Sequence, residues 1–229
     1  MKDLAVIETI LRNRYHFFTE IRDGVGLREK MRAMLISSLL FLALYGAVMG
    51  STASLWQALS SAVKLPILFL ATLVICSPTL YFFNVLFGSN QSLTQNVALM
   101  LTAITVTAVL LLSFAPIVVF FLLTTAGYQF FKLMNVAIFA ICGLVGVVFL
   151  NQGMRIVSAV GKEGTTARRW VTWLWVILYA FVGSQMAWTL RPFIGAPSMK
   201  FELFRQLGGN FYSNIFASIG EFLGFFVVR

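Results

Sequence analysis

Charged residues are scarce in this sequence. Asp, Glu, Lys and Arg make up only 11% of its 229 residues, against about 25% in an ordinary soluble domain. Hydrophobic residues make up 59%, and the mean hydropathy is +0.89. A soluble domain of this length needs a large polar surface, so this much apolar surface must face lipid. The composition excludes a single soluble globule and predicts a multispan membrane protein.

Acidic residues are missing altogether from a long part of the chain. From Lys30 through Lys162 there is no Asp or Glu. Proton- and sodium-driven antiporters commonly place a carboxylate near the middle of the membrane, because the transported cation must be paired with an anion. The absence of acidic residues argues against that class of transporter.

Residues for catalysis and metal binding are equally few. The only histidine, His16, lies in the charged N-terminal segment. The two cysteines, Cys76 and Cys142, lie inside apolar runs, which is typical of small buried hydrophobic residues. Metalloprotease, intramembrane aspartyl and serine hydrolase motifs are absent, and Ser184 has no basic partner that the sequence justifies. We expect no enzyme activity, no metal and no cofactor.

Basic residues outnumber acidic ones by 17 to 8, which gives a net charge of +9. They flank the apolar runs and form no module interleaved with aromatic residues, so nucleic-acid binding is not expected. They instead predict the orientation of the protein in the membrane and contact with anionic lipid headgroups.

Five windows are long and apolar enough to cross about 30 Å of hydrocarbon as helices. We expect an all-α fold: a polytopic membrane helix bundle of about five transmembrane helices, with amphipathic or interfacial helices at both ends. The windows are Ala33 to Gly50, Leu65 to Phe87, Leu93 to Phe114, Phe130 to Leu150 and Trp170 to Leu190.

Signals around the windows predict how they connect. Gly88 to Gln91 is expected to form a tight turn, and Ser92 and Gln95 after it match a capping box at the start of the third window. Pro116 is expected to kink the third helix or to end it, because the apolar run continues beyond it and overshoots the bilayer. Asn151 to Arg169 is the longest polar loop between windows.

The N-terminal region, residues 1–32, is rich in charge and is expected to lie in the cytoplasm. Leu4, Ile7 and Leu11 share one helical face, which predicts an amphipathic helix along the membrane surface. The segment Asp23 to Gly26 is expected to break this helix.

The remaining regions are the five-span bundle, residues 33–190, and a C-terminal region, residues 191–229. We expect the C-terminal region to be extracytoplasmic and to form an interfacial or re-entrant helix, because Asn210, Asn214 and Glu221 are costly to place in lipid. Eleven Lys and Arg residues lie on the side of the N-terminus and six on the other side, which favours this orientation.

Polar residues within the windows are the possible functional positions. Neutral polar side chains ordinarily hydrogen-bond between helices, and they can also line a pore. Basic residues near span ends ordinarily extend to the headgroups. Lys64 can instead point into a cavity between helices, with an anion or a lipid headgroup as its partner. The possible pore, anion or lipid sites are Lys64, Asn84, Asn135, Gln185 and Arg191.

Small residues and prolines predict where helices touch and bend. Glycines spaced three or four residues apart permit close approach of two helix backbones. Prolines inside a helix produce static bends or hinges. The possible packing positions are Gly46, Gly50, Gly143 and Gly146, and the possible kinks are at Pro66, Pro78 and Pro116.

Four groups of short strings occur in the chain, at Ser60 to Pro66, Phe114 to Pro116, Tyr128 to Phe131 with Asn135 to Ala137, and Val182 to Gln185 through Arg191 to Phe193. These strings resemble a family of bacterial five-span inner-membrane proteins. The similarity covers most of the chain from the first window onward, and the layout is loosely similar to Yip1-type membrane proteins, whose diagnostic loop motifs are absent. The resemblance implies a bacterial inner membrane and a five-helix bundle. It implies no activity and no catalytic or binding residue.

The sequence leaves three functions open. The leading one is a non-enzymatic membrane subunit or scaffold that packs against other helices, either by self-association or with other membrane subunits. The alternative is an oligomeric channel or anion-permeable pore with a neutral polar lining and a basic site at Lys64. The third is lipid handling, in which the basic surface and the terminal helices bind the bilayer and its anionic headgroups.

Overall fold

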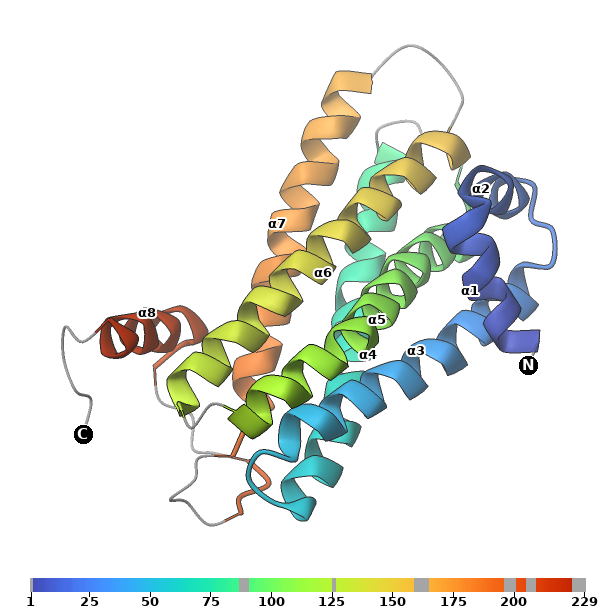
Figure 1. The fold of residues 1–229 in the computed structure, drawn as a ribbon. Coiled ribbons are helices and arrows are strands. Elements are labelled where there is room, and N and C mark those ends of the chain that lie inside the picture. The colour runs from blue at the N-terminus through green and yellow to red at the C-terminus, as the bar shows by residue number, and fades with distance from the viewer. Residues whose placement is uncertain are drawn as a thin grey trace.

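The computed structural model describes residues 2–86, 91–124, 127–158, 165–195, 201–204 and 209–223. Within these ranges the chain is all-α and has eight helices, which Figure 1 shows from the N-terminus to the C-terminus. Some expectations fall outside the described residues: most of the turn at 88–91, the middle of the loop at 151–169, and the basic residues Lys200, Arg205 and Arg229.

Four of these helices are long and apolar enough to cross a membrane, and they indicate a membrane location. At about 1.5 Å per residue, a 32-residue helix such as α4 or α5 extends for about 48 Å, whereas the hydrocarbon is about 30 Å thick. The first four predicted windows fall on these helices. The helices are α3 (Leu27–Gly50), α4 (Leu55–Leu86), α5 (Leu93–Thr124) and α6 (Tyr128–Val157).

The four long helices form two antiparallel pairs, α3 with α4 and α5 with α6 (Figure 1). α5 is the central helix, because it contacts α3, α4 and α6, and most of its residues from Ala98 to Leu111 are buried. Apolar residues on the outer faces of the neighbouring helices are exposed, for example Val74 of α4 and Leu144 of α6. An apolar outer face is what a helix in contact with lipid requires.

α5 continues as a helix past Pro116 to Thr124. Of the two outcomes expected at Pro116, an ended helix is therefore not seen. Proline removes a single backbone hydrogen bond, and membrane helices tolerate this loss when neighbouring residues keep the helix in place. Pro66 and Pro78 likewise lie inside α4.

α7 (Thr165–Thr189) lies mainly against α4, at the edge of the four-helix core. It overlaps the fifth predicted window. The indole N–H of Trp175 donates to the Cys76 carbonyl of α4 at 3.1 Å, and Trp175 is buried. Trp173 and Ile177, on the other side of α7, are exposed.

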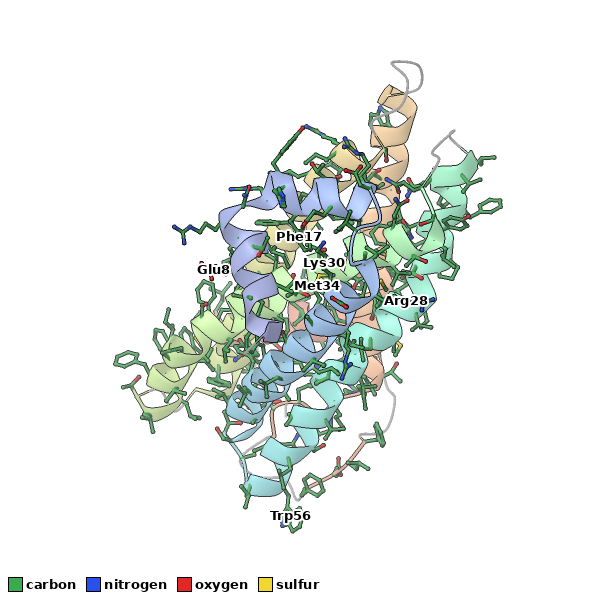
Figure 2. The ribbon with its side chains drawn as sticks, turned by 90° about the vertical axis from the view of Figure 1, so that its right-hand side faces the viewer. Glu8, Phe17, Arg28, Lys30, Met34 and Trp56 are labelled. Atoms are coloured by element: carbon green, nitrogen blue, oxygen red, sulfur yellow. The ribbon has the colours of Figure 1, made fainter. Side chains whose placement is uncertain are left out.

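Two short N-terminal helices, α1 (Lys2–Arg12) and α2 (Arg14–Arg22), pack against the bundle. Their buried side chains include Phe17 and Ile10, and Figure 2 shows Phe17 on the side of α2 that faces the bundle. Leu11, which was expected on the apolar face, is 45% exposed. The bundle leaves Leu11 largely uncovered, so the expected apolar face along the membrane surface stays a prediction.

The expected break between the N-terminal region and the first long helix is confirmed. α2 ends at Arg22 and α3 begins at Leu27. Gly24 and Gly26 between them have φ angles of +74° and +61°, a conformation that glycine adopts without a steric penalty. The turn allows α1 and α2 to fold back onto the bundle.

α8 (Phe211–Phe222) crosses the ends of α6 and α7 and contacts both (Figure 1). This end of the bundle, called the α8 end below, also holds the starts of α4 and α6. The opposite end, called the α2 end, holds the starts of α3, α5 and α7.

Candidate functional site: the polar face of α4

The first turns of α4 carry a polar face at the α8 end of the bundle. Its members are spaced i, i+3, i+4 and i+7, which places them on one side of the helix. All of them are buried, and three of them contact the segment that follows α7. This segment, residues 191–195 and 201–204, is called the α7–α8 segment below. The polar face consists of Gln57, Ser60, Ser61 and Lys64.

Gln57 and Ser61 hold the first part of the α7–α8 segment through main-chain oxygens. The Gln57 Nε2 atom donates to the Pro192 carbonyl at 2.8 Å and to the Phe193 carbonyl at 3.3 Å. The Ser61 hydroxyl donates to the Phe193 carbonyl at 2.6 Å. Buried backbone outside a regular helix needs partners for its polar groups, and these side chains supply them.

Lys64 holds both parts of the α7–α8 segment. Its ammonium donates to the Pro192 carbonyl at 3.3 Å and to the Leu203 carbonyl, and it lies 4.8 Å from the centre of the Phe204 ring. The residue is only 4% exposed. Within the described part of the chain, no carboxylate lies within 4 Å of this ammonium. An anion or lipid partner for Lys64 stays a prediction, because its acceptors in the structure are protein carbonyls.

Glycines let the neighbouring backbones approach α4 closely. A methyl group on Gly46 would overlap the Ser61 carbonyl, and one on Gly50 would overlap the Gln57 carbonyl. A methyl group on Gly195 would overlap the side chain of Ala53, just before α4. The polar face of α4 is therefore held between α3 and the α7–α8 segment by contacts that leave no room for a larger residue.

The other pair of predicted packing glycines lies on α6. A methyl group on Gly146 would overlap the Thr107 hydroxyl and crowd the Ala103 carbonyl of α5. No atom lies within 4 Å of the position that a methyl group on Gly143 would occupy. Gly146 therefore lies at a close contact between two helices of this chain, whereas Gly143 faces open space.

Buried neutral polar side chains hydrogen-bond to other helices. Asn84 donates from Nδ2 to Asn96 Oδ1 at 3.2 Å, and Asn96 donates to the Ser77 carbonyl at 3.2 Å, which links α4 with α5. Asn135 of α6 accepts from the Tyr45 hydroxyl of α3 at 2.9 Å. These bonds satisfy polar groups that lipid could not.

The five predicted site residues do not form a single site. Lys64 and Arg191 lie at the α7–α8 segment, and the Arg191 guanidinium carbon lies 3.4 Å from the ring centre of Trp188. Asn84 and Asn135 belong to the two separate bonds described above, and Gln185 is a half-buried residue of α7. The sequence reasoning missed Gln57 and Ser61, although their spacing with Lys64 was a usable signal.

The α2 end holds the charged contacts. Glu20 lies between the Lys30 ammonium at 3.1 Å and His16 Nδ1 at 3.6 Å. The Asp23 carboxylate accepts from the Arg22 guanidinium at 2.9 Å, and this hydrogen bond raises the pKa of Arg22 above its usual value. Solvent screens pairs close to the protein surface, so these contacts fix local geometry more than overall stability.

No group of three or more His, Cys, Asp or Glu residues that could hold a metal ion occurs in the described ranges. No protein-family model, no curated protein and no solved structure matches the chain. The comparisons identify no family, and the protein is a helical one with four long apolar helices.

Proposed function

We propose that the protein is a non-enzymatic integral membrane protein of a bacterial inner membrane, and that it acts as a helix-packing subunit or scaffold in a membrane complex. The observation that carries the proposal is the use of its buried polar side chains to join its own helices. Tyr45 with Asn135 and Asn84 with Asn96 bind each other across helices of one chain. Such bonds hold the helices of the bundle together from within. The outer faces remain apolar and can contact other helices or lipid.

α7 is the helix best placed to meet a partner. It lies mainly against α4, so a larger part of its surface is uncovered than for the central helix α5. The side chains of Trp173, Leu174, Ile177 and Phe181 recur at spacings of one and two helical turns and are all exposed. In this proposal α7 is the fifth transmembrane helix, and its exposed face contacts a second copy or another membrane subunit.

The proposed topology has the N-terminus in the cytoplasm and the C-terminus outside. Charge supports it, because the side of the N-terminus carries eleven of the 17 basic residues. The topology also requires α7 to be a fifth span. The 25 residues of α7 extend for about 37 Å, which suffices to cross the hydrocarbon.

The test is photocrosslinking of the full-length protein in its native membrane. A photoreactive residue replaces Ile177 on α7 in one variant and Leu144 on the outer face of α6 in the other, and both positions are 63% exposed. We expect the α7 variant to form a covalent adduct with a second copy or another membrane polypeptide, and the α6 variant to label lipid. Lipid adducts alone from both positions would contradict the packing proposal.

A second candidate function, an oligomeric anion-permeable pore, is favoured by one observation. The Lys64 ammonium is buried without a carboxylate within 4 Å in the described residues. The pore is tested by chloride efflux from vesicles that contain purified protein. The efflux is compared with that from vesicles containing the Lys64→Met variant and from empty vesicles. We rank this function second, because the carbonyls of Pro192 and Leu203 already serve as acceptors for the ammonium.

A further inference from the structure

α8 has an apolar face on the side opposite its hydrogen bonds to α6. Tyr212, Phe216, Ile219 and the C-terminal cap residue Leu223 are spaced i, i+4, i+7 and i+11, so they form one side of the helix. They are 42%, 72%, 38% and 60% exposed, respectively. The largest side chains of α8 therefore include several that the described parts of the protein leave largely exposed.

The polar face of α8 is turned toward the bundle. Lys132 of α6 donates from Nζ to Asn214 Oδ1 at 3.0 Å, and Gln129 donates from Nε2 to Glu221 Oε2 at 2.7 Å. Ser218, between these two positions, is 2% exposed and donates to the Asn214 carbonyl at 2.7 Å. The helix is thus attached to α6 by hydrogen bonds on its polar side, and Phe216, Ile219 and Leu223 on the opposite side stay exposed.

We infer that α8 lies in the plane of the membrane at the α8 end of the bundle, with its apolar face inserted among the lipid acyl chains. On a protein in water, an amphipathic helix buries its apolar side and leaves its polar side outside. The reverse arrangement is stable when the medium outside is itself apolar. With 12 residues and a length of about 18 Å, α8 is too short to cross the hydrocarbon.

Aromatic contacts of Tyr212, which is on this face, and of Phe222, which lies beside it, join α8 to the neighbouring helices. The Phe222 ring lies 6.2 Å from that of Phe130 on α6, which lies 5.3 Å from that of Phe121 on α5. The Tyr212 ring stacks on that of Phe181 on α7 at 6.3 Å. α5 and α6 are long enough to span a membrane, so the apolar face of α8 continues a surface that meets lipid.

Residues typical of the membrane interface surround α8. The Lys132 ammonium lies 5.7 Å from the ring centre of Tyr128, and the Arg191 guanidinium carbon lies 3.4 Å from that of Trp188. The Trp188 indole donates to the Gly209 carbonyl, close to the start of α8, at 3.2 Å. Trp and Tyr concentrate at the level of the headgroups, where Lys and Arg also place their charges. α8 therefore lies at the depth of the interface.

The start of α8 needs little water to satisfy its backbone. Asn210 Oδ1 accepts from the Ser213 amide at 2.8 Å, and the Ser213 hydroxyl oxygen accepts from the Asn210 amide at 3.2 Å. This capping box gives hydrogen-bond partners to two backbone amides at the start of α8. Without it, the two amides would lack partners where the headgroups give way to acyl chains.

The test measures where a nitroxide on α8 resides in the full-length protein, reconstituted in phosphatidylcholine vesicles. The label is attached to Phe216→Cys, and its relaxation is recorded with oxygen, which partitions into acyl chains, and with a water-soluble nickel chelate. Leu144→Cys on the outer face of α6 is the lipid reference, and Val25→Cys in the α2–α3 turn is the water reference; both are exposed. Cys76 and Cys142 are buried, so background labelling is low, and the unmodified protein measures it.

We expect the label at Phe216→Cys to match the lipid reference, with high oxygen and low nickel accessibility, and Ile219→Cys to give the same result if the first variant does not reconstitute. Water-like accessibility would overturn the inference. Protection from both reagents, with spin–spin broadening that disappears on dilution with unlabelled protein, would also overturn it, because a second copy would then cover the face.

Discussion

Tyr45 of α3 donates its hydroxyl hydrogen to Asn135 Oδ1 of α6 at 2.9 Å, and both residues are buried. The Asn135 amide donates in turn to the Phe131 carbonyl at 2.8 Å. The Tyr45 ring also packs edge-on against Phe139, with 5.6 Å between the ring centres. A polar and an aromatic contact therefore join α3 to α6 at the same place.

Replacing Tyr45 with Phe keeps the ring contact and removes the hydroxyl. We expect the free energy of unfolding to fall by about 1 kcal/mol, because Asn135 loses its donor in a medium without water. Unfolding by SDS titration from mild detergent measures the change. Tyr15→Phe is the control, since Tyr15 is 68% exposed. Equal effects of the two substitutions would show that the Tyr45 hydroxyl contributes nothing specific.

Gly46→Ala and Gly143→Ala compare a crowded glycine with an open one. The new methyl group at Gly46 would overlap the main-chain carbonyl of Ser61, whereas the one at Gly143 would have no atom within 4 Å. We expect Gly46→Ala to lower the free energy of unfolding by about 1–3 kcal/mol. Gly143→Ala is expected to be neutral or stabilising by up to about 1 kcal/mol, because alanine favours the helix. A larger loss at Gly143 than at Gly46 would contradict the helix contacts described above.

Lys64→Met removes the ammonium that binds two carbonyls of the α7–α8 segment and keeps most of the side-chain volume. We expect the segment to detach more often, so that chymotrypsin added outside vesicles cleaves faster at Phe201 or Phe204. Lys132→Met is the matched control, because Lys132 binds Asn214 of α8 and not the α7–α8 segment. Unchanged cleavage in Lys64→Met would show that Gln57 and Ser61 hold the segment without Lys64.

Phe18→Ala tests how the N-terminal helices are attached. The Phe18 ring is fully buried and fills the space beside Gly153 of α6. We expect the free energy that holds α1 and α2 on the bundle to fall by about 3–5 kcal/mol, as for other buried aromatic residues replaced by alanine. Hydrogen exchange is then expected to accelerate in α1 and α2 and to remain slow in α5, and Tyr15→Ala serves as the exposed control. Faster exchange throughout the bundle would show that the N-terminal helices do not detach as a unit.

The sequence predicts the long helices well because hydrocarbon thickness is a simple physical limit. The windows beginning at Ala33 and Leu65 correspond to α3 and α4, and the capping box is confirmed by two hydrogen bonds between Ser92 and Gln95, at 2.8 Å and 3.2 Å. The helix ends are less predictable: α3 begins at Leu27 and α4 at Leu55. More polar residues continue these helices, for example Arg28 of α3 and Gln57 of α4, so each apolar window marks only part of a helix.

Contacts between distant parts of the chain could not be predicted in the same way. Gln57 and the carbonyl of Pro192 are 135 residues apart, and no local pattern indicates that they meet. In the N-terminal region, Ile10 is buried and Leu11 is exposed, although hydrophobicity alone does not distinguish the two. Tertiary packing decides such details.

Main-chain oxygens provide the hydrogen-bond acceptors by which α4 holds the α7–α8 segment, since Gln57, Ser61 and Lys64 all donate to carbonyls. Every amino acid carries such an oxygen, so exchanging the side chains of Phe193 or Leu203 leaves these acceptors in place. Mutational tolerance is therefore expected to be unequal on the two sides of the contact. A saturation library is expected to accept many residues at Leu203 and few at Gln57 and Ser61. The position of the α7–α8 segment is therefore determined more by the side chains of α4 than by the side chains of the segment itself.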